Sequence, residues 1–221
     1  MTQSVRILSA EPLTHNVRRY RLEKPAGYAF EPGQATELSI DSDELRDKKR
    51  PFTFTALNHE DFLEFTIKSY FDHDGVTKKL WDLKPGDKLI LRDVWGTITY
   101  KGPGTFIAGG AGVTPFIAIL RQLNQDGKLK GHRLIVSDRT DADVILRQEF
   151  EGMQGLEHLW VITDQPDTKF FRGRIDEAFL KQQIGDFAQN FYLCGPDPMV
   201  NALRETLGKL GAKTEAVTFE K

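Results

Sequence analysis

The sequence has little of three things that would narrow its function at once: cysteine, net charge and long apolar runs. Its 221 residues include one cysteine, which excludes a disulfide within the chain and an iron–sulfur cluster held by four of its cysteines. The formal net charge is −2, whereas a nucleic-acid-binding protein usually carries a strong basic excess. No apolar run approaches the roughly 18 residues that span a bilayer, and the N-terminus has no apolar signal core. We therefore expect a cytoplasmic protein with no membrane span and no nucleic-acid partner.

Metal-ligand patterns are missing as well. The five histidines never fall at the spacing of metal ligands. Asp138, Asp141 and Asp143 lack the glycine and the terminal glutamate that a calcium loop requires. We therefore expect no metal site. What the chain does have is an ordinary globular composition, 39% hydrophobic and 28% charged, and enough residues for two domains of about a hundred each.

The first half of the chain has the pattern of short strands separated by turns. Phe62–Lys68, for example, alternates apolar and polar residues and is expected to be a half-buried strand. A helical patch at Val76, Leu80 and Leu83 interrupts the series. The expected strands lie around residues 5–7, 17–22, 35–40, 51–57, 62–70 and 88–94. Six short strands with regular turns predict an antiparallel β-barrel in residues 1–101.

The pattern changes after Lys101-Gly102-Pro103-Gly104, where strands begin to alternate with helices. Such alternation indicates an α/β domain with a parallel sheet, here five-stranded and formed by residues 102–221. The expected strands are 105–108, 133–137, 159–163, 190–194 and 214–219, and the expected helices are 114–125, 144–152, 175–184 and 197–210.

Two apolar runs in this second half stop at glycine and then open into a helical pattern. They are Phe106–Phe116, which contains Gly109, Gly110 and Gly112, and Tyr192–Pro196. This arrangement places bare backbone at the C-terminal end of a buried strand, where α/β sheets bind dinucleotides. We expect the three glycines to adopt positive φ and to let a pyrophosphate approach the main chain, at the N-terminus of the following helix. Pro115 fits the first turn of that helix.

The segment Lys49–Thr55 places a cation, an aromatic ring and a hydroxyl on one extended stretch. It resembles the arginine–x–aromatic–serine/threonine motif of the ferredoxin–NADP reductase superfamily, in its flavodoxin-reductase-like branch. Four further elements match that superfamily in the same order: Pro32-Gly33-Gln34, Gly75-Val76-Thr77, the glycine turn and Cys194-Gly195-Pro196. The resemblance implies a flavin-binding barrel followed by an NAD(P)-binding α/β domain.

The resemblance also assigns the flavin contacts. Arg50 would pair with the flavin phosphate, because a forked guanidinium suits an oxyanion. Phe52 would lie against the flavin, and Thr53 would donate a hydrogen bond near its N5 atom. The Gly-Val-Thr element at a helix start favours FAD over FMN. The flavin-binding residues implied in this way are Arg50, Pro51, Phe52, Thr53, Ile67, Lys68, Tyr70, Gly75, Val76 and Thr77.

For the nicotinamide nucleotide, the resemblance places Cys194 beside the nicotinamide ring, so that Thr53 and Cys194 are the implied catalytic positions. The residues implied to contact this nucleotide are Gly109, Gly110, Gly112, Thr114, Ser137, Arg139, Cys194, Gly195, Pro196 and Met199. Ser137 and Arg139 resemble a pair that reads a 2′-phosphate, whereas Asp138 could accept a bond from a free 2′-hydroxyl. The co-substrate is therefore written NAD(P)H.

The end of the chain departs from many relatives, which finish with an aromatic residue stacked on the flavin. Here Phe219 is the only candidate, and it is expected to belong to the core of the last strand instead. The flavin face could then be open to a small acceptor. Glu220 is either a proton relay to the flavin or a solvated carboxylate.

The function implied by the resemblance is transfer of hydride from NAD(P)H to bound FAD and of electrons to a separate acceptor, such as flavodoxin or ferredoxin. One alternative is an NAD(P)H-dependent reductase of free flavin or another small molecule. Another is a module that binds a nucleotide or a partner without turnover. In isolation, each motif also has an ordinary structural explanation, such as a tight turn for the glycines or a buried strand end for Cys194.

Overall fold

The computed structural model describes residues 2–72, 74–96 and 98–219, which form two compact units. The first unit contains the described residues before 98 together with Thr114–Gln122. The second contains Ile98–Val113 and the described residues from Leu123 onward. The segment Thr114–Gln122 therefore belongs by its contacts to the first unit, although it interrupts the second in sequence.

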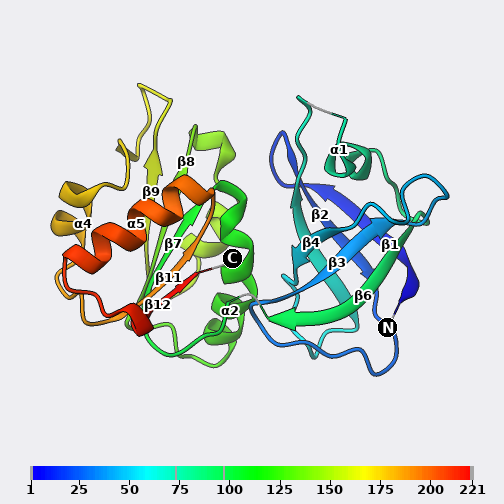
Figure 1. Cartoon of the computed structure of the whole chain (residues 1–221), viewed down its shortest axis with the longest axis horizontal. Helices are drawn as coiled ribbons and strands as arrows, with labels where there is room; N and C mark the ends of the chain where they lie inside the picture. The colour runs from blue at the N-terminus through cyan, green and yellow to red at the C-terminus, as the bar shows by residue number, and fades with distance from the viewer. Residues whose placement is uncertain (1, 73, 97, 220–221) are drawn as a thin grey trace. The chain divides into compact units, whose positions relative to one another are not determined.

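The first unit is a curled antiparallel sheet (Figure 1). Its strands are β1 (Gln3–Pro12), β2 (Val17–Glu23), β3 (Gln34–Ile40), β4 (Arg50–Thr53), β5 (Phe62–Lys68) and β6 (Lys88–Gly96). They lie in the order β4-β3-β6-β1-β2-β5. The two edge strands meet at an antiparallel bridge between Phe54 and Phe65, next to a 2.8 Å hydrogen bond from the amide of Thr55 to the carbonyl of Glu64. This closure confirms the barrel that the sequence predicts.

The barrel interior is apolar, and the short helix α1 (Val76–Trp81) packs against it. Val76 and Leu80 are buried on the inner side of this helix. The hydroxyl of the fully buried Tyr20 donates a 2.8 Å hydrogen bond to the carbonyl of Leu80, and burial raises the pKa of Tyr20 to about 12. The helical patch in the first half is thus anchored to the core by both apolar contact and a backbone hydrogen bond.

One expectation for the barrel is wrong. β5 is not half-buried, because its polar residues Glu64 and Thr66 are 2% and 5% exposed. The alternating pattern is real, but its polar face is covered by residues from elsewhere in the unit, including Arg121. Alternation alone cannot reveal such a cover, since it reports only which side chains share a face.

The second unit is a parallel sheet with helices. Its strands are β7 (Gly104–Gly109), β8 (His132–Asp138), β9 (Leu156–Ile162), β10 (Phe171–Arg172), β11 (Asn190–Cys194) and β12 (Val217–Phe219). Its helical elements are η1 (Gly110–Val113), η2 (Asp141–Asp143), α3 (Arg147–Glu151), α4 (Glu177–Gln183), α5 (Asp197–Lys209) and η3 (Thr214–Ala216). Helix α2 (Thr114–Gln125) begins in the first unit and ends in the second.

All pairings in this sheet are parallel, as expected, but it has six strands instead of five. The additional strand is β10, which has two residues and is too short to leave a periodic pattern. β7 is buried at every position, as is usual for a strand in the middle of a parallel sheet. Helices α4 and α5 pack against the same apolar cluster as β7, β8, β9 and β11.

The strand order, β10-β9-β8-β7-β11-β12, places a reversal of direction between β7 and β11. The chain first proceeds from β7 through β8 and β9 to β10 on one side, and then returns to add β11 and β12 on the other. In open α/β sheets, ligands bind at the carboxyl ends of the strands where the order reverses in this way. The residues that follow β7 and β11 are therefore the candidates for a ligand-binding site.

Candidate functional site

Three of the residues expected at the nucleotide site lie at the carboxyl ends of adjacent strands. Gly109 ends β7 and is in register with Ser137 of β8. Cys194 ends β11 on the other side and is in register with Ala108. The two motifs of the second half, separated by more than 80 residues in sequence, therefore meet at the reversal point of the sheet.

The glycine turn packs directly on the Cys194–Pro196 turn. A Cβ on Gly112 would lie 2.3 Å from the carbonyl oxygen of Cys194, and one on Gly109 would lie 2.6 Å from the sulfur of Met199. The backbone next to Gly112 leaves no room for a Cβ, whereas a Cβ on Gly109 would require the Met199 and Pro196 side chains to shift. Gly195, with φ of 153°, approaches the amide of Gly109 from the opposite side.

This packing corrects one detail of the expected turn. Only Gly110 among its three glycines has a positive φ, at 53°. Gly109 and Gly112 are distinguished by close contacts with their neighbours and not by a positive φ. The turn leads through η1 into α2, which starts at Thr114 with Pro115 in its first turn, as the sequence indicates. The amide groups of a helix start are suited to a phosphate.

The residues after β8 form a second cluster at the same edge. Arg139 is exposed, and its Nε donates a 2.8 Å hydrogen bond to Asp164, which follows β9. This contact raises the pKa of Arg139 and lowers that of Asp164. Asp138, in contrast, is 7% exposed. The sequence analysis did not select Asp164. Its position just after β9, the strand beside β8, could have indicated it, because the carboxyl ends of parallel strands meet at one edge of the sheet.

The turn between β11 and α5 contains the buried Cys194 and leads to the partly buried Met199. Cys194 forms no disulfide within the chain and is 5% exposed, so it fills the end of β11. Pro196 caps α5, and the partly buried Met199 sits in the first turn and packs against the core. These residues can shape a pocket wall, and the buried thiol is poorly placed to act as a nucleophile.

In the barrel, the segment Arg50–Thr53 forms β4, paired with β3. Arg50 and Pro51 are exposed, Phe52 is partly buried against the core, and Thr53 is 6% exposed. Arg50 donates a 2.7 Å hydrogen bond from Nη1 to the carbonyl of its neighbour Lys49. A cation on the surface of an edge strand, with an aromatic ring two residues on, fits the phosphate and ring contacts of a flavin nucleotide.

The remaining flavin candidates are of two kinds. Lys68 and Thr77 are partly buried, and Tyr70 is 48% exposed, so these side chains can reach a ligand. Ile67 and Val76 are 1% and 4% exposed within the barrel core, so only their main chain could make such contacts. Gly75 is the residue that precedes α1, in an extended conformation.

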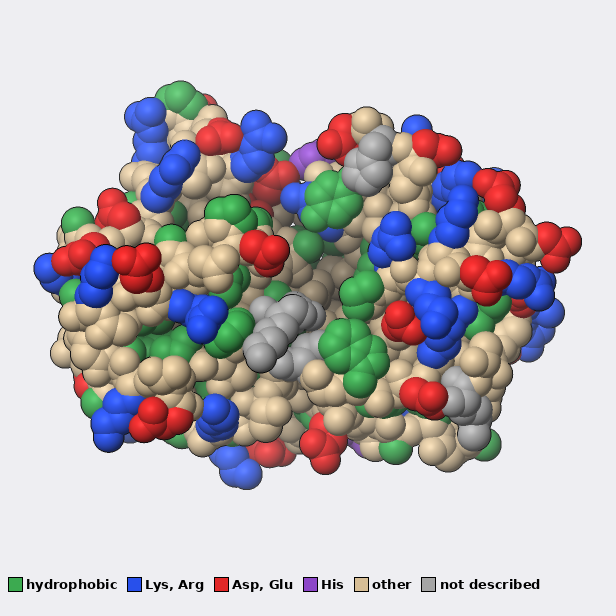
Figure 2. All heavy atoms as spheres, in the orientation of Figure 1, with side chains coloured by type: hydrophobic (Ala, Val, Ile, Leu, Met, Phe, Trp, Pro, Cys, Tyr) green, Lys and Arg blue, Asp and Glu red, His purple; other side chains and the backbone are tan. Residues whose placement is uncertain are grey.

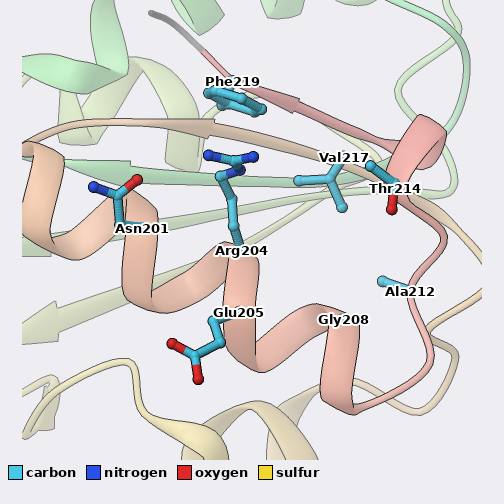
Figure 3. A pocket seen from close by; sticks show the side chains of 8 residues that line it. All are labelled: Asn201, Arg204, Glu205, Gly208, Ala212, Thr214, Val217 and Phe219. Carbon is cyan, nitrogen blue, oxygen red and sulfur yellow. The ribbon is translucent and has the colours of Figure 1, made fainter.

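A pocket of about 330 Å³ lies between α5 and the last strand, away from the expected residues (Figure 3). Arg204 extends from α5, and its guanidinium carbon stacks 3.7 Å from the centre of the Phe219 ring. Phe219 also packs against the apolar cluster of the second unit, as the sequence led us to expect. Glu220 lies outside the described residues. The pocket is lined by Asn201, Arg204, Glu205, Gly208, Ala212, Thr214, Val217 and Phe219.

Within the described ranges, no three His, Cys, Asp or Glu side chains gather closely enough to hold a metal ion. A search of the same residues finds no helix with the length and apolar character needed to cross a membrane.

Comparison with known proteins agrees with this geometry. The family model of the oxidoreductase NAD-binding domain matches residues 106–205, which run from β7 into α5. The crystal structure of a ferredoxin NADP+ reductase from Neisseria gonorrhoeae, with bound FAD and NADP, superposes with a TM-score of 0.87. The alignment covers 99% of this chain and 98% of that one at 18% identity, and it extends the shared fold over both units. In its fold, the chain is similar to members of the ferredoxin–NADP reductase superfamily.

Two curated proteins show how far the similarity extends in sequence. The reductase component of propane 2-monooxygenase from Rhodococcus jostii is 28% identical over 98% of this chain. The present chain spans only 62% of that protein. NADH-cytochrome b5 reductase 2 of Mus musculus is 24% identical, over 89% of this chain and 86% of its own length. The resemblance noted from the five motifs is therefore confirmed at the level of the superfamily.

Proposed function

We propose that this chain is an NAD(P)H-dependent flavoprotein reductase of the ferredoxin–NADP reductase superfamily. Residues 1–101 would supply the flavin-binding barrel and residues 102–221 the NAD(P)-binding α/β domain. The observation that carries the proposal is the meeting of the glycine turn with Cys194–Pro196 at the reversal point of the parallel sheet. The N. gonorrhoeae reductase, which shares the fold, was solved with FAD and NADP bound.

The barrel residues that would hold FAD are those of β4 and of the segment around α1. FAD supplies a hydride-accepting N5 atom and can release the two electrons separately. Arg50 would neutralise a phosphate, Phe52 would pack beside the ring system, and Thr53 would donate a hydrogen bond near N5. Lys68 and Tyr70 have the exposure needed to contact the nucleotide part.

The nicotinamide nucleotide would bind along the carboxyl edge of the sheet. Gly110 and the start of α2 at Thr114 would receive the pyrophosphate, and Ser137 and Arg139 would contact the adenosine ribose. Cys194 would border the nicotinamide. These residues bind and orient, and holding two reactants in register supplies much of the catalytic effect in such a transfer.

The acceptor would be a separate molecule, with flavodoxin or ferredoxin as the first choice. The relatives' names point to protein acceptors: one is a component of a monooxygenase, and the other is named for cytochrome b5. On the face of the protein seen in Figure 2, basic and acidic side chains are interspersed. The single cysteine is consistent with the cytoplasmic location that belongs to this proposal.

A second candidate acceptor is free flavin or another small molecule. Phe219 stacks on Arg204 and packs against the apolar cluster of the second unit, which favours the core role expected for it over stacking on a flavin. A flavin without such a cover would be accessible to small acceptors.

The test is to release and identify the bound cofactor, and then to measure NADH and NADPH oxidation with flavodoxin, ferredoxin, cytochrome b5 and free FMN as acceptors. Turnover with one protein acceptor at low concentration supports the first choice. Preference for FMN supports the second. Nucleotide binding with no turnover on any acceptor, ferricyanide included, would contradict both and leave a binding module.

A further inference from the structure

The pocket between α5 and β12 has the features of a binding site that the proposed function does not use (Figure 3). Its volume of about 330 Å³ is at the lower end of the range for small-molecule sites, which is about 300–1,000 Å³. Helix α5, η3 and β12 all belong to the second unit, so the pocket lies within one compact unit. Its size suits a molecule much smaller than a dinucleotide.

Arg204 is the cation of this pocket. Its guanidinium lies over the ring of Phe219, with 3.7 Å between the guanidinium carbon and the ring centre. Such stacking uses the flat face of the guanidinium, whereas its N–H groups lie in the plane and are directed to the sides. Within the ranges that the structure describes, the Arg204 guanidinium makes no ion pair and no hydrogen bond. The stack therefore orients this cation without neutralising it.

The acidic residue next to Arg204 in sequence is paired with a different cation. Oε1 of Glu205 lies 2.6 Å from Nζ of Lys209, one turn further along α5. This ion pair lowers the pKa of Glu205 and raises that of Lys209. Figure 3 shows the Glu205 carboxylate directed away from the Arg204 guanidinium. The positive charge of Arg204 is thus left for an anionic ligand.

The pocket also has an apolar wall with open space beside it. Ala212 is 9% exposed in the apolar cluster of the second unit, and Val217 packs against that cluster. Gly208 lies four residues after Arg204 and hence on the same face of α5. A Cβ on Gly208 would have nothing within 4 Å. Because glycine weakens a helix relative to alanine, this position gives up helix stability and keeps the space beside it open.

Two neutral polar side chains complete the lining. Asn201 lies one turn before Arg204 on α5, and Thr214 begins η3 on the other side of the pocket. The amide and the hydroxyl can each donate and accept hydrogen bonds. Neither side chain is hydrogen-bonded to another residue in the part of the chain that the structure describes. Both are therefore available to the polar end of a ligand.

We propose that this pocket binds a small carboxylic acid whose apolar body is about the size of one ring. The carboxylate pairs with the edge of the Arg204 guanidinium, whose fork of N–H groups matches two carboxylate oxygens. The apolar body fills the space beside Gly208, against Ala212 and Val217. A phosphate dianion is less suited, because the pocket has one arginine and extends to the C-terminal end of α5, where the helix dipole is negative.

The test measures the binding of benzoate to the full chain by calorimetry and by backbone amide chemical shifts. Two matched ligands separate the two requirements of the site. Benzamide has the ring without the charge, and acetate has the charge without the ring. Inorganic phosphate is the third comparison.

Three variants locate the site. Gly208→Leu fills the pocket from α5 and removes no contact, and Arg204→Met removes the guanidinium but keeps an apolar side chain of similar length. Arg147→Met is the matched control. Arg147 likewise lies over an aromatic ring of the second unit, 5.5 Å from the centre of Phe170, but it is paired with Glu151 and does not line the pocket.

We expect benzoate to bind the wild type and Arg147→Met with equal affinity and to shift amides around residues 201–219. Arg204→Met should bind it about tenfold to a hundredfold more weakly, which corresponds to the loss of a charge-assisted hydrogen bond. Gly208→Leu should not bind it, and should unfold at or above the wild-type temperature because leucine is the better helix former. Benzamide, acetate and phosphate should each bind the wild type at least about tenfold more weakly than benzoate.

Wild-type affinity of Gly208→Leu for benzoate would overturn the proposal, because the ligand would then bind elsewhere. Equal affinity of the wild type for benzoate and benzamide would overturn it as well, since the site would not recognise a carboxylate. So would the absence of benzoate binding to the wild type at millimolar concentration. None of these results bears on the proposed reductase activity, which is measured separately by the reduction of bound flavin.

Discussion

Gly112 approaches the carbonyl of Cys194 so closely that a Cβ at this position would lie 2.3 Å from the oxygen and 2.5 Å from the carbon. Backbone atoms cannot yield as the end of a side chain can. The two motifs that indicated a nucleotide site, the glycine turn and Cys194–Pro196, are therefore in direct backbone contact. The same contact supplies an ordinary packing reason for the glycine, alongside any role in binding.

Gly112→Ala should accordingly be destabilising, by about 1–3 kcal/mol, because overpacking forces the turn away from β11. We also expect weaker NAD(P)H binding. Chemical denaturation and nucleotide titration measure the two effects. The matched control is Gly208→Ala in α5, where nothing lies within 4 Å of the added Cβ. Alanine should stabilise that exposed helical position by about 0.5–1 kcal/mol. Equal stability of Gly112→Ala and the wild type would show that the turn relaxes freely.

Arg50→Ala should release FAD while leaving the fold intact, because Arg50 is exposed and its loss creates no cavity. Loss of one charge-assisted hydrogen bond to a phosphate corresponds to about tenfold to hundredfold weaker binding. Flavin content after gel filtration, together with circular dichroism, measures this. Arg6→Ala, an exposed arginine on β1 paired with Glu23, is the control and should retain flavin. Full retention by Arg50→Ala would refute the anchoring role.

Arg139 and Asp164 should act in opposite directions on the choice of nucleotide. If Arg139 reads a 2′-phosphate, Arg139→Ala should raise KM for NADPH about fivefold more than KM for NADH, a modest effect because the site is exposed to solvent. Asp164→Asn removes a negative charge 2.8 Å from Arg139 and should lower KM for NADPH relative to NADH. Steady-state kinetics with both nucleotides provides the measurement. Equal effects on the two nucleotides would exclude this assignment.

His132 gives the protein a pH-dependent stability. This histidine is 2% exposed, its Nδ1 donates a 3.0 Å hydrogen bond to the carbonyl of Leu129, and its Nε2 accepts one from the hydroxyl of Tyr100 at 2.8 Å. Because the carbonyl can only accept, the ring is the neutral Nδ1–H tautomer. Burial lowers the pKa of His132 below its ordinary value of 6.5.

The unfolded chain therefore takes up the proton at a higher pH than the folded protein, and stability falls as pH drops through about 6.5. The slope for one proton is at most about 1.4 kcal/mol per pH unit. His132→Gln should flatten the curve of unfolding free energy between about pH 7 and the lower folded pKa. The control is His158→Gln, which replaces a histidine at an exposed position of β9. Identical slopes for both variants would contradict the assignment to His132.

Much of the fold could be read from the sequence because each half carries a strong periodic signal. β7 is a continuous apolar run, and α2 and β11 occupy the ranges expected for them. The glycines and the proline of Gly109–Pro115 also indicate where β7 ends and where α2 begins. β10 was missed because two residues cannot express a period, and its pairing depends on β9.

The features that sequence could not provide are those that depend on distant partners. The alternating pattern predicted that Glu64 faces solvent, because no residue near it in the sequence indicates its contact with Arg121. The close contacts of Gly109 and Gly112 likewise involve Met199 and Cys194, which lie in another part of the chain. Local patterns thus identified the segments, and tertiary contacts decided what their residues do.

The central claim is tested most directly by the visible absorption spectrum of the purified protein, recorded anaerobically before and after addition of NADH and then of NADPH. The account predicts a flavin spectrum at about one FAD per chain that is rapidly bleached by at least one of the two nucleotides. A colourless protein that also fails to bind added FAD or FMN would contradict it.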